Sequence, residues 1–260
     1  MNEYIVPHIQ IRRKRHDPSK EKFPHSNPNP AFNPDELSEK QEYCFDSITV
    51  QEIVNSERDY MVVGDLGIGK TSLLLWIAKQ VCSECENAEY IPLFIQIKDV
   101  SQIQTRDAFF SLLDTRYNLN KYDAEGRRFL FLLDGLDQIG KYGNINNSLK
   151  HKDVFGERNK IILTTRPIGY EWIKKDLDPK YEYLQIQLLD NKKIKEYVGD
   201  HYNSENFQAI LSRNNDLLSV PILLKMVKTL LLNNRLSEIK NRTSLYTTFI
   251  SYLFEKWERD

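Results

Sequence analysis

The central part of the chain, from about residue 60 to residue 190, alternates short apolar runs with segments of helical periodicity. The apolar runs are nearly continuous, which is typical of strands that helices cover on both faces. This alternation predicts strand–helix–strand units, and therefore an α/β fold with a parallel sheet flanked by helices. The expected strands are Tyr60–Val63, Ile91–Ile97, Phe129–Leu133, Lys160–Thr164 and Tyr183–Leu188. The expected helices are Thr71–Cys82, Thr105–Thr115, Ile145–Phe155 and Trp172–Leu177.

Beyond Asp190 the pattern changes to helices alone, which predicts a small all-α domain after the sheet. Asp190 and Ser204 are placed to cap two helices, and Pro221 suits the first turn of a third. Thr243 is expected to cap a fourth helix. The apolar stripe of this last helix consists of Leu245, Phe249, Tyr252, Leu253 and Trp257. We expect the stripe to pack in the core, and a surface for a partner is the alternative.

The first 40 residues differ in composition from the rest, because they hold six of the ten prolines among Asn, Ser, Lys and His residues. Such a segment buries little apolar surface and is expected to be extended. Within it, Tyr4–Ile9 is apolar enough to dock on another part of the protein. A helix is expected over Pro34–Asn55. The chain is thus divided into an extended segment (1–40), a sheet-containing core (41–189) and a helical domain (190–260).

Composition says more about the compartment and the partners of the protein than about its chemistry. The 260 residues are 40% hydrophobic and 28% charged, with a net charge of −1, so no global field draws the chain to nucleic acid or an anionic membrane. No membrane-spanning segment is expected, and the three cysteines favour a reducing, cytoplasmic compartment. The basic run Arg12–Arg15 is a local exception. We expect it to be a solvated arm, with a nuclear signal or a nucleic-acid contact as the alternative.

The run GDLGIGKT fills every position of a phosphate-binding loop, between an expected strand and an expected helix. Glycines let backbone N–H groups curl around phosphates, and the helix aims its N-terminus at the same anion. Lys70 can reach the β- and γ-phosphates, and the Thr71 hydroxyl can ligate Mg²⁺. The candidate nucleotide-binding residues of this loop are Gly64, Asp65, Leu66, Gly67, Ile68, Gly69, Lys70, Thr71 and Ser72.

An acidic group follows the apolar run Phe129–Leu133 at the carboxyl end of its strand, where open α/β sheets bind ligands. Asp134 is expected to hold Mg²⁺ opposite Thr71. Asp137 could orient the attacking water. Gln138 stands where many ATPases of this architecture place a glutamate base, and an amide cannot accept the proton of water at neutral pH. The site is therefore expected to hydrolyse slowly.

The strand Lys160–Thr164 leads to Arg166 and Pro167 at the same edge of the sheet. An arginine at this position can approach a γ-phosphate and report its presence. Pro167 restricts the backbone of Arg166 and helps to set its direction. The alternative for Arg166 is a surface ion pair.

These elements together resemble the NACHT family, within the STAND class of P-loop NTPases. Beyond the phosphate loop, the resemblance rests on Tyr90–Ile95, Phe129–Asp137, Leu163–Pro167, Asn215–Leu224 and Leu245–Phe249. It implies an ATP/ADP-driven switch with Mg²⁺, whose ATP-bound form self-associates through the NTPase module and activates an effector. It also implies that Asp134 and Asp137 are the acidic pair, Arg166 the γ-phosphate sensor, and Pro221 a neighbour of the adenine and ribose.

The resulting hypothesis is a switch with slow ATP hydrolysis in innate immune or antiphage defence signalling, with a trigger and an effector that the sequence does not name. Nucleic acid and membranes are not expected partners. One alternative is a nucleotide-holding scaffold that does not hydrolyse ATP, which the amide at Gln138 favours. The other is a constitutive AAA-like ATPase, which would need a trans-acting arginine at a ring interface.

Overall fold

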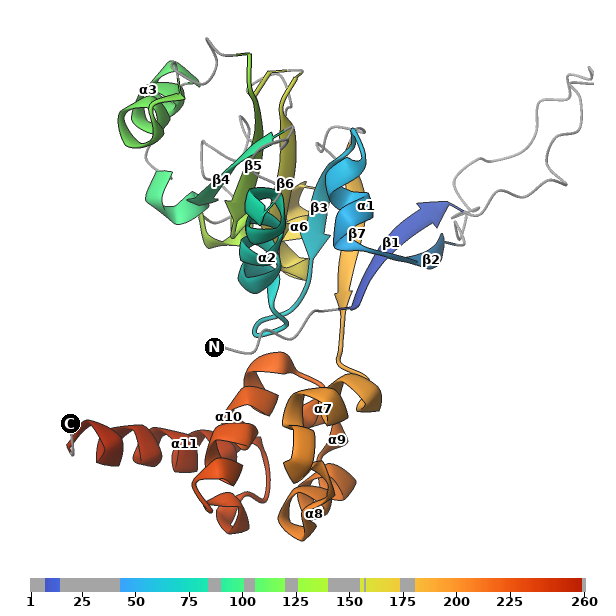
Figure 1. Ribbon diagram of the computed structural model, residues 1–260, viewed down its shortest axis with the longest axis vertical. Coiled ribbons are helices and arrows are strands. Elements are labelled where there is room, and N and C mark those ends of the chain that lie inside the picture. The colour runs from blue at the N-terminus through green and yellow to red at the C-terminus, as the bar shows by residue number, and fades with distance from the viewer. Residues whose placement is uncertain are drawn as a thin grey trace, which may run out of the picture.

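The computed structural model describes residues 8–14, 43–83, 90–100, 106–119, 126–139, 155–156, 158–173 and 181–258. A seven-stranded sheet carries helices on both faces, and further helices follow it (Figure 1). The strands are β1 (His8–Lys14), β2 (Tyr43–Ile48), β3 (Asp59–Val63), β4 (Tyr90–Gln96), β5 (Arg128–Asp134), β6 (Lys160–Thr165) and β7 (Tyr181–Gln187). The helices of the sheet region are α1 (Val50–Asn55), α2 (Lys70–Ser83), α3 (Arg106–Tyr117) and α6 (Pro167–Ile173).

The strand order is β2-β1-β7-β3-β6-β5-β4, and the strands from β3 to β7 run parallel to one another. This confirms the expected α/β sheet and all five expected strands. The order also places β6 between β3 and β5, although β6 follows both in the chain. The expected helix Ile145–Phe155 lies almost entirely outside the described residues. The helix expected at Trp172 begins earlier, at Pro167, because proline suits the first position of a helix.

The N-terminal part of the chain differs from the sequence expectation. β1 comes from the segment expected to stand outside the core, yet it pairs antiparallel with both β2 and β7. The helix expected over Pro34–Asn55 is wrong for residues 43–49. Here Tyr43–Ile48 form a strand, and α1 starts only at Val50. The missed signal is a capping box, because Thr49 and Glu52 cap each other's backbone and open the helix at that point.

Two hydrophobic clusters fill the two faces of the sheet. α1 and α2 cover one face with buried residues that include Ile53, Leu73 and Ile77. The opposite face packs an aromatic group around Phe131, with Phe155 at 5.0 Å between ring centroids. Alternation along β1 places Ile9 and Ile11, each 2% exposed, on the α2 face, so the neighbouring positions point to the other face. Arg12 is accordingly half-buried against tyrosines, and the expected solvated arm is wrong for this residue.

The C-terminal helices share a third core of their own. They are α7 (Asn191–Val198), α8 (Glu205–Arg213), α9 (Asn215–Leu218), α10 (Pro221–Leu232) and α11 (Arg242–Trp257). Asp190 and Ser204 cap α7 and α8 as predicted, and Pro221 opens α10. The predicted cap of α11 at Thr243 is wrong, because Asn241 forms a capping box with Ser244.

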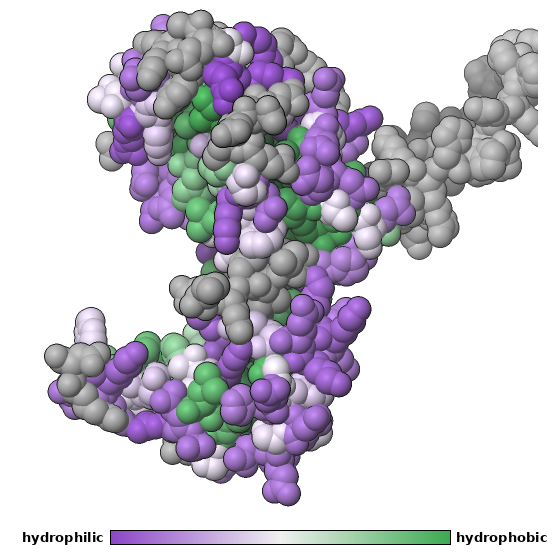
Figure 2. Space-filling model, viewed as in Figure 1, coloured by the Kyte–Doolittle hydropathy of each residue, from purple (hydrophilic) through white to green (hydrophobic). Residues whose placement is uncertain are grey.

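The apolar stripe of α11 is only partly buried. Leu245 lies in the core and Phe249 and Tyr252 pack against it, but Leu253 is 46% exposed and Trp257 82% exposed. The core expectation is therefore wrong for the last two residues, because α11 projects beyond the other C-terminal helices (Figures 1 and 2). Among the described helices, none combines the length and the apolar character that a membrane crossing requires.

Lys160 is a buried cation at the start of β6, only 1% exposed. Its ammonium group donates hydrogen bonds to the carbonyl oxygens of Ile53, Val54 and Ser56 at the end of α1. These carbonyls have no partner within the helix, and a cation there also complements the helix dipole. Lys160 thus ties α1 to β6.

We predict that Lys160→Met lowers the free energy of unfolding by about 2–4 kcal/mol, because it leaves buried carbonyl groups without a charged donor. Urea denaturation measures the change. The control is Lys192→Met on the exposed face of α7, which should stay within about 0.5 kcal/mol of the wild type. Equal stabilities of the two variants would contradict the capping role of Lys160.

Candidate nucleotide-binding site

The strand order brings three chemical groups to one edge of the sheet. The phosphate loop follows β3, Asp134 ends β5, and Arg166 follows the intervening β6. These groups line a cavity of about 680 Å³ that is also bordered by the first turn of α10. Every predicted site residue except Gly64 and Asp65 lines this cavity. The structure therefore gathers the predicted residues at one place.

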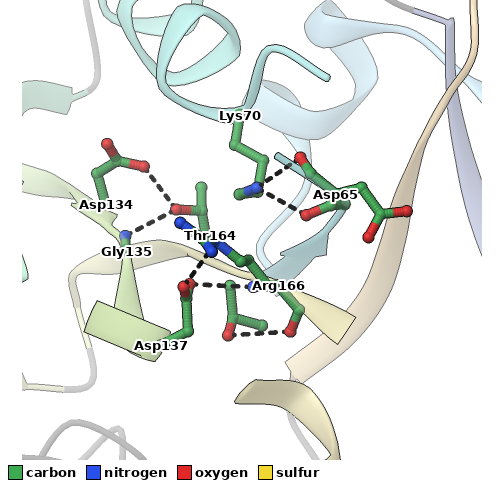
Figure 3. A network of polar contacts seen from close by, with 9 residues as sticks. Asp65, Lys70, Asp134, Gly135, Asp137, Thr164 and Arg166 are labelled. Atoms are coloured by element: carbon green, nitrogen blue, oxygen red, sulfur yellow. Dashed lines mark hydrogen bonds and ion pairs between the residues drawn. The ribbon is translucent and has the colours of Figure 1, made fainter. Parts of the chain in front are cut away.

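The phosphate loop closes on its own lysine. The Lys70 ammonium donates hydrogen bonds to the carbonyl oxygens of Gly64, at 2.6 Å, and Asp65, at 3.0 Å (Figure 3). Gly67 and Gly69 adopt φ angles of +80° and +106°, which disfavour any residue with a Cβ. Burial lowers the pKa of Lys70, and the nearby Asp137 carboxylate opposes this shift. A phosphate would stabilise the charged form that burial disfavours.

Asp134 accepts one hydrogen bond at each carboxylate oxygen. The Thr71 hydroxyl donates to Oδ2 at 2.6 Å, and the Thr164 hydroxyl donates to Oδ1 at 2.6 Å. The Gly135 N–H in turn donates to the Thr164 hydroxyl at 2.9 Å (Figure 3). The Thr71 hydroxyl and the Asp134 carboxylate thus form an adjacent pair of hard oxygen donors, which is the ligand type that Mg²⁺ prefers. The residues present fit the ion that the sequence predicts.

Asp137 and Arg166 are bound to each other. The Arg166 Nε lies 3.0 Å from Asp137 Oδ2, and the Arg166 backbone N–H donates to Oδ1 at 3.1 Å. The Asp137 side chain is 7% exposed and the Arg166 side chain 44% exposed, so the arginine covers the carboxylate at the cavity wall. The Asp137 carboxylate is therefore held by Arg166 at the wall of the cavity.

Gln138 folds back over the turn that follows Asp134. Gly135 has a φ of +85°, and a Cβ at this position would lie 2.4 Å from Gln138 Nε2. Only glycine leaves room for the amide here. Gln138 lines the cavity together with Asp137 and Arg166.

α10 touches the phosphate loop directly. The Ile222 N–H donates to the Gly67 carbonyl oxygen at 3.3 Å, and a Cβ on Gly67 would lie 2.4 Å from Ile222 Cγ2. Pro221, next to Ile222, has no N–H to donate and lines the cavity beside the loop. The C-terminal helices therefore form one wall of the cavity.

Comparison with known families agrees with this arrangement. The NACHT domain family model matches residues 58–205, which is more than half of the chain. The chain belongs to the NACHT family. It is thus a P-loop NTPase domain, and the family is one of nucleotide-binding proteins. No curated protein matches the chain.

Solved structures resemble this NACHT chain only distantly. Drosophila ORC bound to DNA has a TM-score of 0.48 and 12% identity, over 77% of this chain and 57% of that one. The Aeropyrum pernix ORC1 protein in complex with DNA has a TM-score of 0.47 and 10% identity, over 75% and 59%. The Aeropyrum pernix ORC2 protein has a TM-score of 0.45 and 10% identity, over 75% and 62%. The NACHT chain therefore spans less than two thirds of each of these chains.

Several residues at this site were not predicted from the sequence. Thr164 was expected only as the end of a strand, and the available signal was a polar residue at the carboxyl end of an otherwise apolar strand. Trp76, Lys79 and Tyr197 also line the cavity. Ser72, Trp76 and Lys79 follow one another on α2 at intervals of about one helical turn. This spacing could have indicated that Trp76 and Lys79 share the face of Ser72.

We predict that Thr164→Val weakens the binding of nucleotide with Mg²⁺ by about 10-fold, because Asp134 loses the hydroxyl that orients Oδ1. Calorimetric titration with ADP in the presence of Mg²⁺, and then in excess chelator, measures the effect. In chelator the affinity should change less than about twofold. Thr164→Ser keeps the hydroxyl and is the matched control. An equal loss under both conditions would show that Thr164 does not act through a metal.

Proposed function

We propose that this NACHT chain is an ATP/ADP-dependent molecular switch that binds Mg²⁺ and hydrolyses ATP slowly. The observation that carries the proposal is the cavity shared by the phosphate loop, Arg166 and the first turn of α10. A nucleotide in that cavity would contact both the sheet edge and the C-terminal helices. Because the groups that would read the γ-phosphate face the C-terminal helices, which have a core of their own, the nucleotide state can bias the arrangement of the sheet region and these helices.

The phosphates would bind by exchange of partners within the site. Lys70 would leave the carbonyl oxygens of Gly64 and Asp65 for the β- and γ-phosphates. Thr71 and Asp134 would hold Mg²⁺, which supplies positive charge that neutralises the phosphate oxygens. The backbone N–H groups after Gly67 would complete the cradle at the start of α2.

Arg166 would distinguish the triphosphate from the diphosphate. Without a γ-phosphate, its guanidinium remains on the Asp137 carboxylate. With one, the anion competes for the same guanidinium and frees Asp137 to orient a water molecule. A ligand shifts a conformational equilibrium only through its different affinity for the two states, and the γ-phosphate supplies that difference here.

The biological role rests on membership of the NACHT family. We propose that the ATP-bound form self-associates through the NTPase module and activates an effector in innate immune or antiphage defence. A preference for ATP over other nucleoside triphosphates and a cytoplasmic location belong to the same proposal.

We predict that Lys70→Ala weakens ATP binding by more than about 100-fold, because it removes the cation that the loop positions for the phosphates. Calorimetric titration of the purified chain measures the affinity. Lys192→Ala, which removes an equal charge on exposed α7, should bind as the wild type does. Unchanged binding in Lys70→Ala would refute the switch.

The rate of hydrolysis separates the switch from a scaffold that holds ATP without turnover. The amide at Gln138 specifically favours the scaffold as a second candidate, because it cannot serve as a general base.

We predict that Gln138→Glu raises kcat for phosphate release by about 10- to 100-fold, because a carboxylate beside Asp137 can accept the proton of water. Steady-state phosphate release measures kcat, and Gln138→Ala should show no gain. If neither the wild type nor Gln138→Glu releases phosphate while both bind ATP, the scaffold is correct.

A further inference from the structure

Arg12 on β1 lies against two tyrosines from different parts of the chain. Ile11 pairs with Leu184, so Arg12 lies beside Tyr183 on the neighbouring strand β7. The Arg12 guanidinium carbon is 4.2 Å from the centroid of the Tyr183 ring. Arg12 Nη2 also donates a hydrogen bond of 2.8 Å to the Tyr170 hydroxyl on α6. A single side chain of β1 thus holds a strand and a helix at once.

The two tyrosines also contact each other. Their ring centroids are 5.1 Å apart at an interplanar angle of 68°, in an edge-to-face arrangement. Both rings pack against the hydrophobic cluster on the face of the sheet opposite α2. A planar guanidinium can stack on one ring while an N–H group at its edge reaches a hydroxyl, and this combination is specific to arginine.

Tyr170 belongs to the first turn of α6, which begins directly after Arg166. The Tyr170 N–H donates to the Arg166 carbonyl oxygen at 3.0 Å. Gly169, the residue before Tyr170 in this turn, lies close to Thr165 and Asp137. A Cβ on Gly169 would lie 2.3 Å from Thr165 Oγ1 and 2.8 Å from the Asp137 Cβ. The turn therefore cannot move toward Asp137, and Arg12 holds the next residue of the turn, Tyr170.

We propose that Arg12 is a positioning residue for Arg166. By holding Tyr170, Arg12 keeps the first turn of α6, and with it the backbone of Arg166, where the guanidinium reaches either Asp137 or a γ-phosphate. The inference rests on the proposed switch, because it assumes that Arg166 reads the γ-phosphate. It makes recognition of the triphosphate depend on the docking of β1, a strand more than 150 residues before Arg166 in the chain.

The test compares binding of ADP and of a non-hydrolysable ATP analogue, each with Mg²⁺, by calorimetric titration of the full chain. In Arg12→Ala we expect the Kd of the analogue to rise about fivefold and the Kd of ADP to change less than about twofold. Tyr170→Phe removes the hydroxyl and keeps the ring, so its effect should be smaller, about two- to threefold on the analogue. Gln10→Ala, two residues away on the same strand, is the control and should change neither Kd.

A double-mutant cycle decides whether Arg12 acts through Arg166. In the Arg166→Ala background, Arg12→Ala should add no further loss of analogue binding, because the residue that it positions is gone. Additive losses, or equal losses of ADP and analogue binding, would overturn the inference and show a general effect on the fold. If Arg12→Ala does not fold, the same cycle is measured with Tyr170→Phe.

The experiment also separates this inference from the switch on which it rests. If Arg166→Ala weakens the analogue selectively and Arg12→Ala does not, only the positioning role of Arg12 is wrong. If the wild type binds neither nucleotide, both proposals are wrong.

Discussion

The arrangement of the site depends on one carboxylate. Asp134 is 5% exposed, and each of its oxygens accepts a hydrogen bond from a threonine hydroxyl. Burial of a carboxylate without hydrogen-bond donors costs free energy, so the fold has to keep both threonine hydroxyls within reach of Asp134. Thr71 lies in the first turn of α2 and Thr164 lies in β6, and Asp134 itself ends β5. The single group therefore sets the spacing between the phosphate loop, β6 and β5.

This spacing requires β6 to lie between β3 and β5. If β5 lay beside β3 instead, Thr164 and Arg166 would stand outside the space between the phosphate loop and Asp134. The observed order brings Arg166 to the middle of the edge, where the Asp137 carboxylate is within reach at 3.0 Å. The same strand order brings the first turn of α6 into contact with β1 and β7, because Tyr170 bonds to Arg12 and packs on Tyr183. β1, which is far from Arg166 in the sequence, could thus influence the position of Arg166.

Much of this arrangement could be predicted from the sequence, because its signals are local. The continuous apolar runs predicted the five parallel strands, and the glycine loop and Asp134 follow those strands directly. The helix expected over Pro34–Asn55 was wrong for residues 43–49, because the capping box at Thr49 starts the helix only at that point. Thr164 and Arg12 were missed for a different reason. Their roles arise from strand order, which places residues side by side that no local pattern connects.

The groups that would bind a nucleotide are paired with other groups of the protein. Lys70 is held by two loop carbonyls, Thr71 by Asp134, and Arg166 by Asp137. Binding is then an exchange of partners, so its free energy is the difference between two sets of contacts. ADP would replace the partners of Lys70 and Thr71, and only a γ-phosphate would also replace the partner of Arg166. A site built in this way would distinguish the two nucleotides by one ion pair, and the elements that hold Arg166 in place would set the size of the difference in affinity.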